Sequence, residues 1–502
     1  MHAEENVKQI ESYSLVQQQE TDIHKYRTDE PGPPIPEKDG EPQFTKRQII
    51  KNVLVVSIAF VVLFISYGSM ANLQSSLNME SGVGSGSLAV IYAAMIISCL
   101  FVPSFLIAHI GCKWSIVLSI TGYIAYMVAN FYPVWATMVP ASILIGLGAG
   151  PLWSAKCTYL TTLGVWYARM TGQSEDAIIN RFFGVFFMFF QSYQIWGNII
   201  IFSIFSSSSS TASNTSDTSV PEQRICGARF CPSQIAASNN TNLERPVDTK
   251  IYILCGVFVT CAVSGMFIII LFLDRMKLVK EDQQTKRVSP RVLMASIKHL
   301  ITSRYQILLV PLTVYSGIEQ ALIGGDFTRS FITCTLGIHY VGYIMICYGV
   351  VDAFCSFLFG QLVKSVGHIP FFVLAFVLHG SCQIVFLLWD PDSNSLYVFY
   401  IIAGIWGMGD AVIQTQINAL YGLLFKDNME SGFANYRLWE SVGFIIQYAY
   451  NDYLCTSTKL HISLAILITG MFGYATVEVL QRRENNSKML GDTRNGITVT
   501  TA

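Results

Sequence analysis

Ionisable side chains inside apolar stretches are the residues of this sequence that could do chemistry. Such a residue is costly within a membrane span and usually faces the interior of a helix bundle. The predicted spans of the first half of the chain contain no acidic residue, so these groups are unevenly divided. The candidates in the second half are Glu319, Asp326, Asp352, Asp410, Arg437 and Glu440.

The first half contributes mainly amide side chains. Gln191, Gln194 and Asn198 are spaced i, i+3 and i+7, so they are predicted to line one side of a helix. Two isolated basic groups, His109 and Lys156, occur close to the ends of predicted spans. We take the three amides, together with the ionisable residues of the second half, as candidates for an internal coupling site.

The acidic residues have two interpretations, and the sequence leaves both open. In the functional interpretation, carboxylates in a polar cavity take up and release protons or cations as the two halves rock; Glu319 and Asp352 favour it. In the structural one, Asp410 and Glu440 neutralise Arg437, whose i, i+3 spacing from Glu440 favours an intrahelical pair. Asp326 is expected near the outer face, in contact with solvent.

Catalytic and cofactor-binding patterns are not found in the sequence. The glycine-rich stretch 146–151 lacks the Lys-Ser/Thr of a phosphate-binding loop and lies in an apolar run, which favours close helix packing. No His/Cys cluster has metal-ligand spacing, and no nucleophile motif appears. We therefore predict no enzymatic activity, no metal and no cofactor. A net charge of −1 provides no basic field for nucleic acid.

Long apolar runs must position the candidate residues. The 502-residue chain is 52% hydrophobic and 13% charged, whereas soluble proteins carry about 25% charged residues. A run of about 20 apolar residues can span a bilayer. We predict an all-α integral membrane protein with twelve spans, at 50–70, 88–109, 114–131, 134–157, 182–205, 251–273, 306–325, 341–362, 370–389, 395–424, 433–452 and 460–481.

Polar segments divide these spans into two groups of six. The distribution of Lys and Arg places both termini and the central linker in the cytosol. The predicted organisation is a disordered tail at 1–47, an N-terminal half at 48–273 with an extracellular loop at 206–250, a basic linker at 274–305, a C-terminal half at 306–481 and a tail at 482–502.

The extracellular loop carries two further signals. Asn214 and Asn239 each begin a glycosylation sequon, in the one long loop that the charge distribution places outside. Cys226 and Cys231 lie in the same polar loop, where the environment is oxidising, and a local disulfide between them is predicted. The cysteines within apolar runs are expected to be small buried hydrophobic residues.

An internal repeat supports the division into two halves. Gly111 and Gly367, Gly148 and Gly404, and Arg181 and Arg437 share one offset of about 256 residues. Two parallel six-helix halves are the architecture of the major facilitator superfamily.

Several longer motifs resemble a known family. They are the stretches 67–78, 150–160, 189–192, 196–198, 315–321, 325–330, 337–342 and 433–440. Over residues 45–480 the chain resembles the Unc-ninety-three (uncoordinated) family, and within it the A-like branch.

This resemblance implies a fold of the major facilitator type. Transported substrates are not established for the family, so the resemblance does not by itself imply transport. Members of the family are associated with the regulation of two-pore-domain potassium channels and with escorting Toll-like receptors. The family's defining residues, carried onto this chain, are Asn72, Leu73, Gln74, Glu319, Gln320, Asp326, Asn435, Arg437 and Glu440.

Three functions follow as hypotheses. The first is an accessory protein that regulates a potassium channel in the cell membrane, with an internal membrane as the alternative location. The second is a secondary transporter of a small solute or ion, suggested by the repeat and the intramembrane acids. The third is a trafficking chaperone for receptors, for which Tyr13-Ser-Leu-Val16 offers a tyrosine-based sorting signal. The expected partners are the lipid bilayer and a membrane protein.

Overall fold

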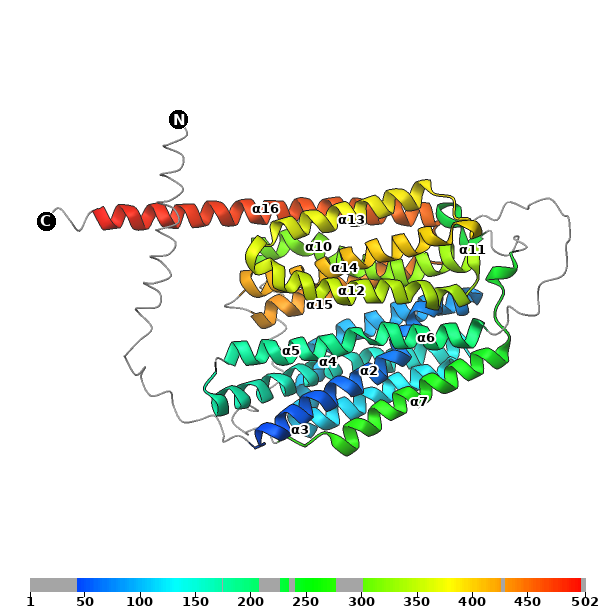
Figure 1. Ribbon diagram of the computed structural model, residues 1–502, viewed down its shortest axis with the longest axis horizontal. Coiled ribbons are helices and arrows are strands. Elements are labelled where there is room, and N and C mark those ends of the chain that lie inside the picture. Colours follow the sequence, from blue (N-terminus) through cyan, green and yellow to red (C-terminus); the bar gives the residue numbers. More distant parts are fainter. Residues whose placement is uncertain are drawn as a thin grey trace. The chain divides into compact units, whose positions relative to one another are not determined.

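The computed structural model describes residues 43–173, 175–206, 226–233, 240–276, 301–425 and 429–497. The described chain is almost entirely helical (Figure 1). Asn214, Asn239, Tyr13 and most of the predicted basic linker lie outside the described residues. The predictions attached to them therefore stay predictions.

The first half consists of six helical elements. They are α2 (Lys46–Leu77), α3 (Val83–Ala129), α4 (Trp135–Thr171), α5 (Glu175–Gln191), α6 (Tyr193–Ser206) and α7 (Asp248–Phe272). A break inside α3 separates two spans, and α5 and α6 together form one span.

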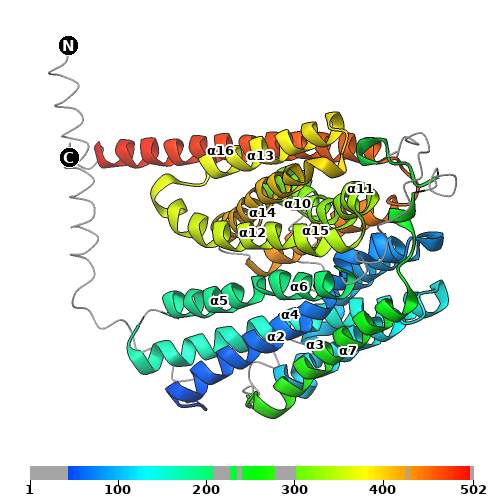
Figure 2. The same ribbon diagram turned by 45° about the vertical axis from the view of Figure 1, so that its right-hand side comes forward.

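The second half begins with a composite span. It consists of α10 (Arg304–Ala321), the π-helix η5 (Leu322–Thr333) and the short α11 (Cys334–Leu336). The remaining helices are α12 (His339–Val366), α13 (Ile369–Leu388), α14 (Leu396–Leu424), α15 (Met429–Ala449) and α16 (Thr456–Ile497). The two halves form separate layers in the turned view (Figure 2).

The predicted all-α membrane fold is confirmed. Eleven spans among the described residues are long and apolar enough to cross a bilayer. The 21-residue helix α15 supplies a twelfth, since about 1.5 Å of rise per residue gives it a membrane's length. Its Arg437 and Glu440 make it less apolar than the others. Helix α2 begins and α16 ends at the same end of the bundle, as an even number of crossings requires (Figure 1).

The backbone repeats the sequence repeat. Gly111 interrupts α3 at φ 78° and ψ 168°, and Gly367 ends α12 at φ 79° and ψ 177°. A positive φ of this kind favours glycine, which has no Cβ. The same backbone break therefore follows the second span of each half.

The π-helix η5 extends the seventh span beyond its predicted end. The predicted end lies near residue 325, whereas the span runs from Arg304 to Leu336. All twelve residues of η5 are buried. Polar residues such as Asp326 and Arg329 obscured the continuation, because their partners come from α16 and from the turn before it.

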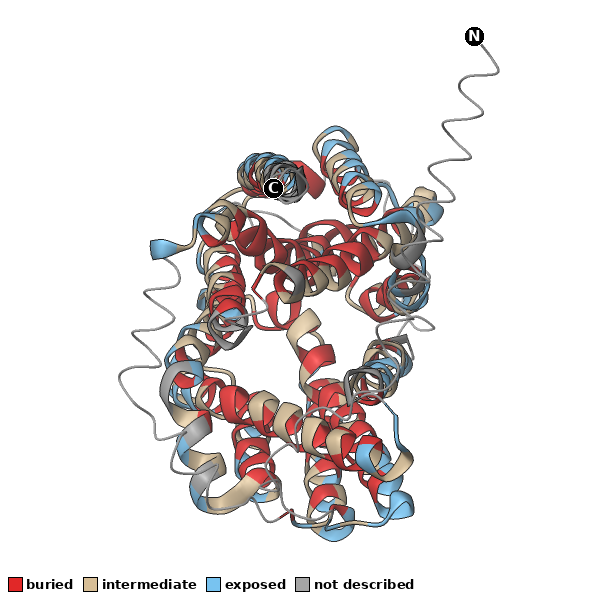
Figure 3. Cartoon of the chain, turned by 90° about the vertical axis from the view of Figure 1, so that its left-hand side faces the viewer, coloured by how far each residue is buried: buried red, intermediate tan, exposed pale blue. Residues whose placement is uncertain are grey.

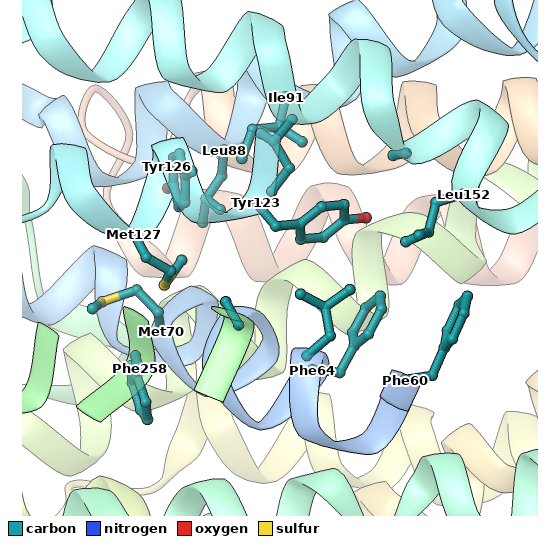
Figure 4. Packing of buried hydrophobic residues seen from close by; sticks show 14 of the residues in the cluster. Phe60, Phe64, Met70, Leu88, Ile91, Tyr123, Tyr126, Met127, Leu152 and Phe258 are labelled. Atoms are coloured by element: carbon teal, nitrogen blue, oxygen red, sulfur yellow. The ribbon is translucent and has the colours of Figure 1, made fainter. Parts of the chain in front are cut away.

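Aromatic side chains form the core of the first half. Phe64 lies within 5.9 Å of Tyr123, and Phe60 within 6.3 Å of Phe64, measured between ring centroids (Figure 4). Buried residues face the interior of each half, and exposed residues lie on the outer sides (Figure 3). The outer sides carry many large apolar residues, as expected for a surface in contact with lipid.

The predicted disulfide between Cys226 and Cys231 is wrong. Cys226 is bonded to Cys334, and Cys231 is bonded to Cys455. The segment that carries the first two cysteines packs against the second half, so each finds a partner far away in the sequence. Spacing within the loop could not reveal these partners, because Cys334 lies within the seventh span and Cys455 directly precedes the twelfth.

Candidate functional site

Three acidic residues of the second half are buried on three different helices. Glu319 of α10 is 0% exposed, Asp410 of α14 is 4% exposed and Asp352 of α12 is 5% exposed. Glycine allows the close approach that buries them: a Cβ at Gly407 would lie 2.7 Å from the carbonyl oxygen of Tyr348 on α12. The structure thus places all three acids inside the bundle.

Glu319 is the least satisfied of these acids. No donor among the described residues lies in hydrogen-bond geometry with either of its carboxyl oxygens, although Asp410 and Gln414 approach the carboxyl closely enough to interact with it. The charged neighbours that act on it are Asp410 and Asp352, both of the same sign, while Nε2 of His379 lies 3.9 Å from Oε2. A buried polar group without a partner is costly. Glu319 is therefore the group best placed to accept a proton or a cation.

A hydrogen-bonded chain surrounds His379 on α13. The amide of Gln383 donates to the hydroxyl of Tyr315 (3.1 Å), and this hydroxyl lies 3.0 Å from Nδ1 of His379. Nε2 lies 3.2 Å from the carbonyl oxygen of Trp406, which can only accept. The network thus assigns the proton to Nε2 and lets Nδ1 accept from Tyr315. In this arrangement both ring nitrogens of His379 have a hydrogen-bond partner.

The other two acids have partners. The hydroxyl of Tyr348 donates to Asp410. Asp352 accepts from Ser356 on its own helix and from Nε2 of Gln191, each at 3.3 Å. Since Gln191 belongs to α5, this last bond joins the two halves. Sequence analysis proposed both residues separately, and the structure brings them together.

The other two amides of the fifth span, Gln194 and Asn198, are hydrogen-bonded within the first half. Gln194 accepts from Asn72 at 3.2 Å and donates to Tyr193 at 3.0 Å, both within the first half. Asn198 is buried and donates to the backbone oxygen of Gln194 at 2.7 Å. A Cβ at Gly349 of α12 would lie 2.7 Å from Cβ of Gln194. These two amides thus shape the contact between α6 and α12.

Arg437 and Glu440 form the intrahelical pair that the spacing predicted, at 2.6 Å. Glu440 is 5% exposed and also lies within hydrogen-bond distance of Tyr436 (3.0 Å), Ser316 (3.4 Å) and Gln320 (3.5 Å). Asp410 accepts from Tyr348 instead of pairing with Arg437. The predicted pair of Arg437 with Glu440 is therefore present, whereas the predicted neutralisation of Arg437 by Asp410 is not found.

Asp326 is buried, so the prediction that it contacts solvent is wrong. It is 2% exposed and pairs with Lys459, which is 1% exposed. Gln447 also donates to Asp326, at 2.6 Å. A second pair, Arg329 with Asp452, lies beside it. Burial of the whole π-helix removes these charges from water and forces them to pair.

Sequence analysis missed three ionisable residues with clear structural roles. Lys459 and Arg329 lie just outside predicted spans, and His379 is one of a few polar residues in a very apolar run. The role of each residue can be recognised only together with its partner, and that partner lies elsewhere in the sequence. Lys156, noted in the sequence, is 1% exposed and lies over the rings of Trp153, Phe183, Phe186 and Phe187 at 4.4–5.2 Å. Cation–π contacts stabilise such a buried ammonium.

The arrangement suits binding or coupling. Among the described residues, no group of three or more His, Cys, Asp or Glu could hold a metal ion. The acids meet tyrosine, amide and imidazole groups from several helices, and one of these bonds crosses between the halves. The contacts of this site therefore change when the halves move relative to each other.

Comparison with known proteins identifies the family. A family model described as "Ion channel regulatory protein UNC-93" matches residues 74–476. The chain belongs to the UNC-93 family. The matched region contains every acidic residue of the central site and both buried ion pairs of η5. The resemblance inferred from the motifs is confirmed.

Relatives in the UNC-93 family are similar to most of this chain. "Protein unc-93 homolog A" of Xenopus laevis is 47% identical over 444 residues, covering 87% of this chain and 94% of the relative. The human protein of that name is 41% identical over 439 residues, covering 86% and 94%. "Putative potassium channel regulatory protein unc-93" of Caenorhabditis elegans is 35% identical over 438 residues, covering 86% of this chain and 61% of the relative.

Solved transporter structures share the fold of this UNC-93 protein. The nucleoside transporter NupG superposes with a TM-score of 0.56 at 11% identity, covering 84% of this chain and 98% of the other. The D-xylose-proton symporter gives a TM-score of 0.55 at 12% identity, covering 86% and 96%. At this identity the likeness shows the fold alone. The expected major-facilitator architecture is thereby confirmed.

Proposed function

We propose that this UNC-93 protein is an accessory protein of a potassium channel in the cell membrane. The observation that carries the proposal is the likeness along 438 residues to the Caenorhabditis elegans protein named for potassium channel regulation. The family description, ion channel regulatory protein, supports it. In this role the chain needs no catalytic step and no cofactor.

The lipid-facing surface of the second half is suited to a membrane-protein partner. Helices α12 and α13 expose large apolar side chains, among them Phe354, Phe357 and Val377. Gly360 and Gly380 lie on these helices, and a Cβ at either would meet nothing within 4 Å. Small residues let helices of two membrane proteins approach closely. A channel helix could therefore pack there without any change in this chain.

Recovery of a channel with this chain tests the proposal. The tagged full chain would be co-expressed with each member of a panel of potassium channels, including two-pore-domain channels, and purified in mild detergent. We expect one channel to be recovered in excess over an unrelated twelve-span protein at equal expression. Gly360→Phe, with Gly256→Phe on α7 as the matched control, tests whether the α12 surface is the contact. Recovery of no channel above the control would contradict the proposal.

A second function, secondary transport, is favoured by one specific observation. Neither buried carboxyl oxygen of Glu319 meets a donor from the described part of the chain in hydrogen-bond geometry, Asp410 lies close to it, and Gln191 bonds Asp352 across the halves. A proton or cation that binds there would alter contacts which must change if the halves rock.

Uptake into liposomes distinguishes transport from regulation. Purified protein would be tested with a solute panel under an imposed proton or sodium gradient. Transport predicts gradient-dependent uptake that Glu319→Gln or Asp352→Asn abolishes, whereas Ser203→Ala on the exposed side of α6 leaves it unchanged. Uptake that survives both acid substitutions would contradict coupling through this site.

A further inference from the structure

One segment of the first half is bonded to the second half. Residues 226–233 and 240–243 follow α6 and precede α7 in the sequence; we call these described residues the strap. Cys226 of the strap is bonded to Cys334, at the end of η5, and Cys231 to Cys455, just before α16. The strap thus connects the last residues of the seventh span with the first residues of the twelfth.

Hydrogen bonds fix the strap over the same elements. The backbone N–H of Thr456 donates to the carbonyl oxygen of Phe230 at 2.9 Å. The amide of Asn240 donates to the carbonyl oxygen of Cys334 at 2.9 Å, and that of Asn242 reaches the same oxygen at 3.2 Å. These bonds, together with the disulfides, fix the described residues of the strap to the second half.

A small apolar cluster lies beneath the strap. Phe230 and Leu243 pack with both cysteines of the first disulfide, and Met79 of the first half joins them. The link from Leu243 to the start of α7 at Asp248 spans five peptide bonds, which reach at most about 17 Å. The strap therefore contacts both halves, and it limits how far the start of α7 can move from the two disulfides.

The surface that the strap holds contains the two ion pairs of η5. Arg329 of η5 pairs with Asp452 in the turn between α15 and α16, and its guanidinium lies 5.5 Å from the ring centroid of Phe230. Asp326 of η5 pairs with Lys459 of α16. Both pairs join the elements that the disulfides join.

The first half rests on this surface through polar contacts. Ser75 of α2 donates to the carbonyl oxygen of Gly325 at 2.8 Å, and Ser76 accepts from Thr333 at 3.0 Å. Asn451 donates to Ser85 at 2.8 Å, and a Cβ on Gly82 would lie 3.0 Å from Asp452. If the halves separated at this end, all of these contacts would break.

We propose that the strap is a disulfide clamp that keeps this end of the molecule closed. Only four residues separate Cys226 from Cys231, so the end of η5 and the start of α16 are held at a nearly fixed separation. The surface on which α2 and the turn at 78–85 rest is then fixed as well. Reduction of the disulfides releases the clamp. The inference concerns conformation and does not depend on a channel partner.

Thiol labelling at the contact tests the clamp. Ser75 is buried at the contact between the halves, so Ser75→Cys reports when this end opens. In proteoliposomes, its reaction with a charged maleimide would be compared between the intact strap and Cys226→Ser with Cys334→Ser and Cys231→Ser with Cys455→Ser. We expect labelling to be about tenfold faster or more without the clamp, since its rate follows the open population. Ser393→Cys, exposed in the turn between α13 and α14, should react equally fast in both backgrounds.

Reduction of the folded protein covers the case in which the serine variants misfold. A charged phosphine supplies two electrons to each disulfide, which takes up two protons and becomes two thiols, while water oxygen converts the phosphine to its oxide. Spectroscopic distances between labels on α2 and α16 should then broaden towards longer values and return on reoxidation. Unchanged distances after complete reduction, or equal protection of Ser75→Cys in both backgrounds, would overturn the proposal.

Discussion

Buried ion pairs dominate the energetics at the scale of single residues. Lys459 and Asp326 are almost completely removed from solvent, and Gln447 supplies a further hydrogen bond to the carboxylate. Desolvation makes each buried charge costly, so the loss of one member leaves the other as an uncompensated charge. The exposed pair of Arg229 and Asp390, at 2.9 Å, faces no such cost.

Removing one member of the buried pair should destabilise the fold strongly. We expect Lys459→Met to lower stability by about 3–5 kcal/mol, because Asp326 is left as an unpaired buried charge. Adding Asp326→Asn should recover much of this loss. The control Asp390→Asn should cost about 1 kcal/mol or less. Thermal unfolding in detergent, followed by tryptophan fluorescence, measures all three. A single substitution as mild as the control would contradict the role of the pair.

Glu319→Gln tests the unpartnered acid at the same scale. The amide keeps the size of the side chain but has no charge beside the acidic neighbours Asp410 and Asp352. We expect stability to be unchanged or raised, by about 1–3 kcal/mol, because the cost of burying a charge is removed. The same unfolding measurement applies, with Asp352→Asn as the comparison. A large loss of stability would contradict this and would show that the carboxyl is held by its contacts with Asp410 and Gln414.

Sequence patterns predicted single residues well where the partner is local. The i, i+3 spacing of Arg437 and Glu440 predicted their pair correctly. The predictions for Asp326, Cys226 and Cys231 are wrong because their partners lie more than a hundred residues away or on another span. No local spacing carries that information.

At the scale of elements, glycines determine how closely the helices pack. Gly317 of α10 and Gly443 of α15 allow the two helices to touch: their Cβ atoms would lie 2.0 Å from the carbonyl oxygen of Glu440 and 2.1 Å from that of Val314. The contact matters for the site, because α10 carries Glu319. Because a Cβ at either position would collide with backbone atoms, no change of side-chain rotamer could relieve the clash.

Gly317→Ala should therefore separate α10 from α15. Overpacking of this kind costs about 1–3 kcal/mol, and the contacts of Glu440 with Ser316 and Gln320 should weaken as the helices move apart. Gly360→Ala on α12 is the matched control, because its Cβ meets open space and alanine favours a helix. Melting temperatures of the two variants provide the measurement. Equal melting temperatures would contradict this close packing of α10 against α15.

The extent of the elements was predictable where hydropathy alone defines a span. The fourth span continues to Thr171, beyond its predicted end at residue 157. The seventh span is also longer than predicted, since the polar sequence 325–330 is typical of a helix end and yet continues as a buried π-helix. The repeat was predictable, because Gly111 and Gly367 occupy one backbone conformation that glycine adopts most easily. Tertiary partners explain why the seventh span continues, and local sterics explain why glycine occupies both breaks of the repeat.

At the scale of the whole molecule, two six-helix halves meet at the end that carries the disulfides. The contacts of Ser75, Ser76 and Ser85 with the second half lie at this end. The distribution of basic residues predicts that it faces outside. Disulfides persist in an oxidising environment, so their presence agrees with that orientation.

Glycosylation provides a test of the orientation. We expect Asn214 and Asn239 to be glycosylated in cells, so that removal of N-glycans increases electrophoretic mobility and Asn214→Gln with Asn239→Gln abolishes the shift. Epitope tags at both termini should be detected only after permeabilisation. A tag that is accessible in intact cells, together with unmodified sequons, would reverse the predicted orientation.

Potassium current is the most direct measurement of the central claim. Whole-cell currents would be recorded from cells that express each channel of the panel, with and without this protein, at matched channel abundance in the cell membrane. The account predicts a reproducible change in current for at least one channel, and none with the unrelated twelve-span control. Unchanged currents across the whole panel would contradict an accessory role and leave secondary transport as the better explanation of the buried acids.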